Sequence, residues 1–166
     1  MRSYTINGPA DYAQSQSWPK SSLPLPQPGV LCLVSAQDVQ ELEVALAKGG
    51  LPVDFEAKLN RLAGESLLHR SVEQNCRLFI ALLQATNSGL FRRATEAEKS
   101  RLLRVLAYVR KDDDAIPDYK PGGFLDDQRE VRAAATEFET LLDDFKSWRL
   151  RYQVPGMWVR RDGVLE

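Results

Sequence analysis

Residues 131–148 read VRAAATEFETLLDDFKSW, and the spacing of their apolar side chains decides the fold class. An α-helix brings residues three and four positions apart onto one face, so apolar residues at these steps predict a helix that packs lengthwise on another. We expect a helix over about 126–151, with Phe138 and Leu141 buried against residues 102–109. The apolar residues at alternating steps of three and four are Val131, Ala134, Phe138, Leu141, Phe145 and Trp148.

The segments before this one carry four further helix patterns. Ser35 is placed to cap the first helix, and Thr95 with Glu98 forms the capping box of the fourth. Val30–Val34 is a β-type run, but one strand cannot form a sheet. The sequence therefore predicts an all-α fold, a compact bundle of about five helices. Apolar residues recur at helical spacing between Ser35 and Gly49, and over about 54–63, 65–86 and 96–110.

The chain divides into a helical domain and two short flanking segments. At 166 residues, 43% apolar and 27% charged, it has the profile of one globular domain, which we place at 30–154. Residues 1–29 hold five prolines among serines and glutamines. They have too few apolar side chains to offset the entropy of ordering, so we expect an extended proline-rich N-terminal arm. Residues 155–166 are expected to form a C-terminal tail.

Sequence features that mark export, membrane spans or cysteine frameworks are absent. No run approaches the roughly 18 apolar residues of a spanning helix, and the N-terminus lacks a basic region followed by an apolar one. We therefore expect a cytoplasmic protein. Cys32 and Cys76 are too few for a disulfide framework or a cysteine zinc site, so both are expected to be small core residues.

Residues 112–127, DDDAIPDYKPGGFLDD, form an acidic connection between two helix patterns. Proline fixes φ and removes a backbone donor, and paired glycines permit left-handed conformations, so the chain is expected to turn sharply here. The aspartates have two interpretations, of which the first is a structural role. Asp118 is placed for an Asx-turn, and Asp126 and Asp127 lie at a helix N-terminus, where carboxylates are stabilising.

The second interpretation of the aspartates is a cation site. Mg²⁺ and Ca²⁺ prefer oxygen ligands, and Asp114, Asp118, Asp126 and Asp127 would converge if the loop folded back on itself. The spacing fits no EF-hand. A divalent cation is therefore the one cofactor that the residues suggest, and both interpretations stay open.

The same connection resembles the signature loop of the YkvA-like domain, a family of small bacterial helical proteins. Tyr108 precedes the loop, 114–118 matches the Asp-x-Ile-Pro-Asp element, and 124–127 matches the aromatic, leucine and paired aspartates. The resemblance covers about residues 100–138 and implies a small helical protein without naming an activity. The turn is one residue shorter than in the family, and Gln128-Arg129 replaces apolar residues. Members are often membrane-associated, but this more polar helix argues against peripheral membrane association.

Charge is segregated along the chain although the net charge is only −1. Residues 91–111 hold seven basic and two acidic residues, 112–144 hold three and eleven, and 145–161 hold five and none. A basic helix beside an acidic one accounts for this pattern. Nucleic-acid binding is an alternative, because basic and aromatic residues interleave near the C-terminus. The residues concerned are Arg149, Arg151, Tyr152, Trp158, Arg160 and Arg161.

Catalytic signatures are missing from the sequence. There is no nucleophile elbow, phosphate-binding glycine loop or dinucleotide fingerprint, and His69 lacks metal-ligand spacing and is expected at the boundary of a helix face. The leading hypothesis is a non-catalytic protein-interaction or regulatory module whose partner is another protein chain. The alternatives are a metal-binding protein or metal-dependent hydrolase that uses the aspartate loop, and a nucleic-acid-binding protein.

Overall fold

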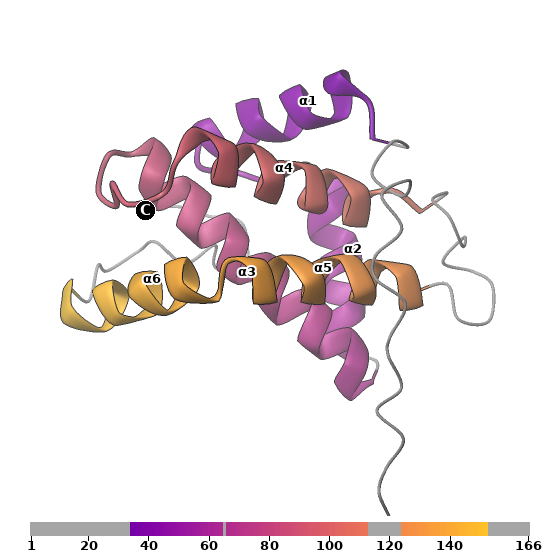
Figure 1. Cartoon of the computed structure of the whole chain (residues 1–166). Coiled ribbons are helices and arrows are strands. Elements are labelled where there is room, and N and C mark those ends of the chain that lie inside the picture. The colour runs from indigo at the N-terminus through magenta and orange to yellow at the C-terminus, as the bar shows by residue number, and fades with distance from the viewer. Residues whose placement is uncertain (1–33, 65, 113–123, 153–166) are drawn as a thin grey trace, which may run out of the picture.

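The computed structural model describes residues 34–64, 66–112 and 124–152, and within these ranges the only regular secondary structure is α-helix (Figure 1). The all-α prediction is confirmed, and the described residues form six helices where about five were expected. They are α1 (Ala36–Ala47), α2 (Val53–Gly64), α3 (Leu67–Asn87), α4 (Glu96–Arg110), α5 (Leu125–Glu137) and α6 (Glu139–Tyr152).

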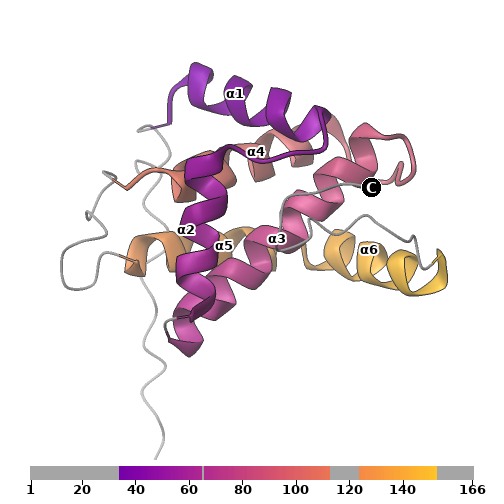
Figure 2. The ribbon, with the colours of Figure 1, turned by 180° about the vertical axis from the view of Figure 1, so that it is seen from behind.

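Helix α3 is the centre of the bundle. Each of the other five helices contacts it, and its buried residues include Val72, Cys76, Phe79, Leu82 and Leu83. A helix that is apolar on most sides requires neighbours on most sides. Helices α1 and α4 lie next to each other along one side of α3 (Figure 1). Helix α2 also packs on α3 and lies in front of it when the molecule is seen from behind (Figure 2).

The helix ends follow the expected capping chemistry. Ser35 and Thr95 both form complete capping boxes, with Asp38 and Glu98 as the reciprocating residues. The backbone N–H of Glu98 donates to Thr95 Oγ1 at 3.2 Å, and the Glu98 carboxylate accepts from the Thr95 N–H at 2.7 Å. Gly89, with φ of +72°, ends α3 in a left-handed conformation that other residues rarely adopt. These local signals therefore set where the helices begin and end.

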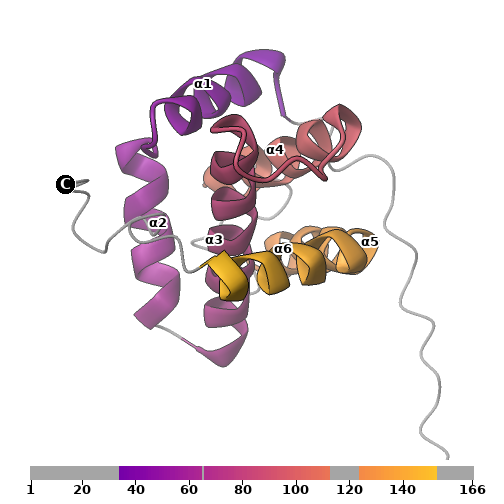
Figure 3. The ribbon, with the colours of Figure 1, turned by 90° about the vertical axis from the view of Figure 1, so that its left-hand side faces the viewer.

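The single helix expected over 126–151 is wrong, because the chain breaks at Phe138 into α5 and α6. Phe138 has ψ of +23°, far from the helical value of about −42°. Its N–H still donates to Ala134 O, and its carbonyl accepts from the Leu142 N–H, so helical hydrogen bonding resumes at once. Seen from the α6 end, α6 lies in front of α5 (Figure 3). The break thus separates α5 from α6, and the apolar face of α6 still packs on the core.

The expected burial of this segment is confirmed despite the break, but its expected packing against residues 102–109 holds only for α5, since Leu141 belongs to α6, which packs on α3 and α5. Val131, Ala134, Phe138, Leu141 and Phe145 are buried, and Trp148 packs against them half-buried. Helix α5 lies between α3 and α4, whereas α6 contacts α3 and α5. Helix α6 is therefore the outlying helix of the bundle.

Several expectations concern residues outside the described ranges. These are the arm over 1–29, most of the β-type run, Cys32, the loop over 113–123 and the tail over 155–166. Of the described helices, none combines the length and apolarity needed to cross a membrane.

Truncating Phe138 to alanine should strongly destabilise the fold. The side chain is 9% exposed at the junction of α5 and α6, and removing a buried phenylalanine ring costs about 3–5 kcal/mol. Glu139 is exposed, so Glu139→Ala should change stability by less than about 0.5 kcal/mol. Urea unfolding of both variants measures the contrast. Equal stability of the two would show that the junction is not packed as described.

Candidate functional site: a buried charged layer and a basic helix end

Five polar residues lie inside the bundle where α2, α4 and α5 meet. We call Lys58, Tyr108, Asp126, Asp127 and Glu130 the buried charged layer. Lysine, aspartate and glutamate are almost never fully buried unless paired. These residues are therefore expected to be paired with one another or with neighbouring groups.

Lys58 of α2 joins two helix ends. Its ammonium lies 3.3 Å from Asp127 Oδ2 and donates to the backbone oxygen of Lys111 at 2.7 Å. Lys111 is the C-cap of α4, where a cation complements the helix dipole, and Asp127 lies in the first turn of α5, where an anion does so. One ion pair thus satisfies the C-terminus of α4 and the N-terminus of α5 together. The ring of Phe124 completes this environment, with its centroid 5.5 Å from the ammonium.

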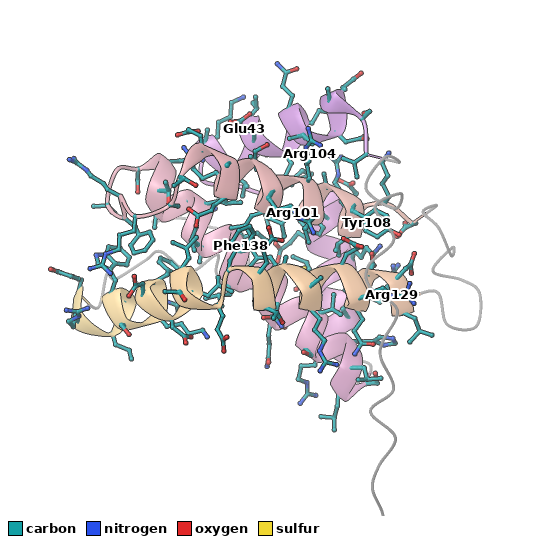
Figure 4. The ribbon with its side chains drawn as sticks, in the orientation of Figure 1. Glu43, Arg101, Arg104, Tyr108, Arg129 and Phe138 are labelled. Carbon is teal, nitrogen blue, oxygen red and sulfur yellow. The ribbon has the colours of Figure 1, made fainter. Side chains whose placement is uncertain are left out.

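Three further contacts connect α4 to α5. The Tyr108 hydroxyl donates to Asp126 Oδ2 at 2.7 Å between two buried side chains. Arg101 lies 3.6 Å from Glu130 Oε2 and donates to Glu137 Oε2 at 3.3 Å. Figure 4 shows Tyr108 and Arg101 extending from α4 toward α5. The basic helix beside an acidic helix, expected from the charge pattern, is this pair of helices.

The buried charged layer is closed to solvent. Lys58 is 3% exposed and Asp127 is fully buried, so a reactant in solution does not reach them. Nearby Cys76 is also fully enclosed, and burial raises the pKa of its thiol, which suppresses the reactive thiolate. The expectation that Cys76 is a core residue is confirmed.

The proposed cation ligands are only partly described. Asp126 and Asp127 bind Tyr108 and Lys58, and the Lys58 ammonium already supplies the positive charge beside Asp127. Asp114 and Asp118 lie outside the described ranges. Within those ranges, no cluster of three or more histidine, cysteine or carboxylate side chains is placed to hold a metal ion. The four-aspartate site therefore stays a prediction.

Sequence reasoning missed Lys58, although a signal was present. Phe55, Leu59 and Leu62 share one face of α2, and Lys58 lies on that same face at helical spacing. A lysine on an apolar stripe indicates a buried partner of opposite charge. His69, in contrast, is half-buried as expected, and its ring packs on Phe124 at 4.7 Å between centroids.

Ion pairs at the surface join both α1 and α2 to the C-terminal end of α4. Lys111 lies 2.7 Å from Asp38, and Arg110 donates to both carboxylate oxygens of Asp54 at 2.6 and 3.3 Å. Hydrogen bonds from Lys111 and Ser35 lower the pKa of Asp38 to about 2. Burial of Asp54 opposes ionisation, but its hydrogen bonds with Arg110 prevail and leave its pKa lowered.

A second candidate region lies at the far end of α6. We call it the basic aromatic end, and it comprises Phe91, Arg92, Trp148, Arg149, Arg151 and Tyr152. Phe91 packs on Phe145 and Trp148 at 5.2 and 5.6 Å between centroids, and Trp148 packs on Tyr152 at 5.8 Å. This aromatic row leads from the core to the surface, where Tyr152 is 65% exposed. The guanidinium of Arg149 lies over the Phe145 ring at 5.8 Å.

The basic aromatic end carries surplus positive charge. Arg93 pairs with Asp144 at 2.6 Å, and Lys146 pairs with Asp143 at 2.8 Å. Arg92 and Arg151 instead donate to the backbone carbonyls of Gly89 and Ser147. A carbonyl carries no net charge, so these bonds orient the guanidinium groups without neutralising them.

Three of the six residues expected to bind a partner therefore lie together, namely Arg149, Arg151 and Tyr152 on the last turn of α6. Trp158, Arg160 and Arg161 lie outside the described ranges. Sequence reasoning did not find Arg92, because only the fold brings the connection between α3 and α4 beside α6.

Comparison of the chain with protein-family models, with curated proteins and with solved structures finds no match. The resemblance to the YkvA-like domain over residues 100–138 stays a prediction. Two of the residues that carry it, Tyr108 and Asp126, contact each other directly.

Breaking the Lys58–Asp127 pair from one side should cost more than removing both charges. Lys58→Met removes the buried ammonium that lies beside Asp127, for which a loss of about 3–5 kcal/mol is expected. Adding Asp127→Asn should recover part of that loss, because the carboxylate that lost this ion pair is then neutral. A double-mutant cycle by urea unfolding measures the coupling, with exposed Lys48→Met as control. Additive losses would mean that the two groups do not depend on each other.

Acid should remove the contribution of Asp38 to stability. Its pKa is about 2 in the folded chain and about 3.9 in an unfolded one, so the stabilisation is present above pH 4 and is lost as pH falls through 2. After allowance for solvent screening, we expect wild type to exceed Asp38→Asn by about 1 kcal/mol near pH 6, and the difference to shrink below pH 4 and to vanish below pH 2. Urea unfolding across this pH range tests it. A difference that did not vary with pH would contradict the assigned ion pair.

Proposed function

We propose that this chain is a non-catalytic, helical protein-interaction module that binds its partner through the basic aromatic end. The observation that carries the proposal is the last turn of α6, where a largely exposed tyrosine continues an aromatic row from the core and arginines flank it. The buried charged layer, in contrast, is closed to solvent and positions the helices.

The chemistry of this surface suits protein recognition. Tyrosine and arginine are enriched among the residues that dominate binding energy at interfaces, and exposed aromatic groups mark interaction sites. Tyr152 and Arg149 share the inward-facing side of α6 with Phe145 and Trp148, at helical steps of three and four. Packing of Trp148 and Phe145 therefore supports the exposed groups from below, and a supported side chain loses less entropy on binding.

Nucleic-acid binding draws on the same residues but is favoured less. A single-strand platform stacks successive bases on successive aromatic faces. Trp148 is half-buried and its ring stacks on Phe145 at 5.7 Å, so along this row Tyr152 is the ring that offers a largely open face within the described residues. The net charge of −1 also lacks the basic excess typical of nucleic-acid-binding domains.

Site-specific photo-cross-linking tests the proposal. A photoreactive amino acid at position 152 of the full chain, in cells that express it natively, should yield a protein adduct of discrete mass. The same group at Leu150 is the matched control, because Leu150 is 79% exposed on the opposite side of the same helical turn.

Arg151→Glu should abolish the adduct formed at position 152. Absence of a discrete adduct, equal adducts from positions 150 and 152, or adducts that nuclease removes would each contradict the proposed function.

A further inference from the structure

We infer that the partner of the basic aromatic end is an acidic segment of another protein that carries an apolar or aromatic side chain. This inference rests on the proposed function and specifies the chemistry of the partner. It follows from how charge and apolar surface are combined at the end of α6 and in the neighbouring connection.

Charge gives the sign of the partner. The carboxylates of α6 near this surface, Asp143 and Asp144, are paired with Lys146 and Arg93, so they do not offset the remaining arginines. The guanidinium of Arg151 is held by the backbone carbonyl of Ser147, a group without net charge, and that of Arg92, in the connection that packs on α6 through Phe91, is held by the carbonyl of Gly89. Arginine presents a planar fork of donors that matches a carboxylate in a two-point contact. A segment with aspartate or glutamate side chains fits these donors.

The aromatic row gives the second requirement. The ring of Tyr152 lies against Trp148 and extends the buried row by one exposed step. An apolar or aromatic side chain of the partner that packs on Tyr152 would remove both from water, and such burial supplies affinity where charge pairs mainly supply specificity. An acidic segment without apolar residues would therefore pair with the arginines and leave the ring of Tyr152 exposed to water.

The flanking segments of the same chain do not have this composition. The side chains of residues 1–33 include Arg2, Lys20 and Asp11, and those of 153–166 include two arginines, Asp162 and Glu166. Neither segment is acidic, so charge complementarity points to a separate chain. The competing occupant is the acidic run Asp112–Asp118 of a second copy, and measurement of self-association distinguishes it from a separate chain.

Selection from a displayed library of random short peptides on the full chain tests the inference. Selected peptides should be enriched in aspartate and glutamate together with leucine, phenylalanine or tryptophan. A labelled selected peptide should lose about tenfold or more in affinity on Arg92→Glu/Arg151→Glu, and binding should weaken as salt rises. Tyr152→Ala should weaken it as well. The controls are Lys48→Glu, an exposed charge reversal at the end of α1, and Leu150→Ala, and both should bind normally.

Four outcomes would overturn the inference. They are selection of no peptide, selection of peptides without acidic residues, equal binding by Arg92→Glu/Arg151→Glu, and displacement of the peptide by oligothymidine. Concentration-dependent self-association that Arg151→Glu abolishes, seen by sedimentation, would replace the separate partner by a second copy. A protein cross-link from position 152 combined with non-acidic selected peptides would reject the partner chemistry and leave the proposed function standing.

Discussion

The ion pair between Lys58 and Asp127 is the contact on which the arrangement of α2, α4 and α5 depends. Two charges withdrawn from water cost several kcal/mol each unless they are paired closely and hydrogen-bonded. Here the pair lies where the C-terminus of α4 and the N-terminus of α5 approach each other, so each charge also complements a helix dipole. Apolar packing around α3 supplies most of the burial, but apolar contacts are non-directional, and this pair fixes which helix ends meet.

Most of the fold could be predicted from local patterns, and the exceptions have physical causes. Ser35 and Thr95 cap their helices through hydrogen bonds to residues three positions later, so the sequence alone predicts where these two helices begin. The break at Phe138 keeps the backbone hydrogen bonds on both sides and does not interrupt the apolar spacing. The spacing of apolar residues therefore could not reveal it. The buried partner of Asp127 lies in another helix, and its distance along the chain hides the pairing until the fold is known.

The same reasoning separates the two candidate regions. Three of the residues at the end of α6 were predictable, because basic and aromatic residues interleave along one short segment. Arg92 was not, since it lies in the connection between α3 and α4, which the packing of Phe91 on Trp148 and the pairing of Arg93 with Asp144 bring beside α6. The buried charged layer joins α2, α4 and α5, and α6 follows α5 outside it, so the surface proposed for binding is presented by a helix that carries less of the core.

Native-state hydrogen exchange tests the central claim most directly, because it reports the free energy of opening for each helix separately. If Lys58 and Asp127 join α2, α4 and α5 into one cooperative unit, the slowest amides of α5 should exchange with the same opening free energy as those of α3. In Lys58→Met, the opening free energies of α5 and α6 should fall further than that of α3, so that α5 and α6 open separately from α3. Opening of α5 independently of α3 in the wild-type chain, or identical patterns in both proteins, would contradict the account.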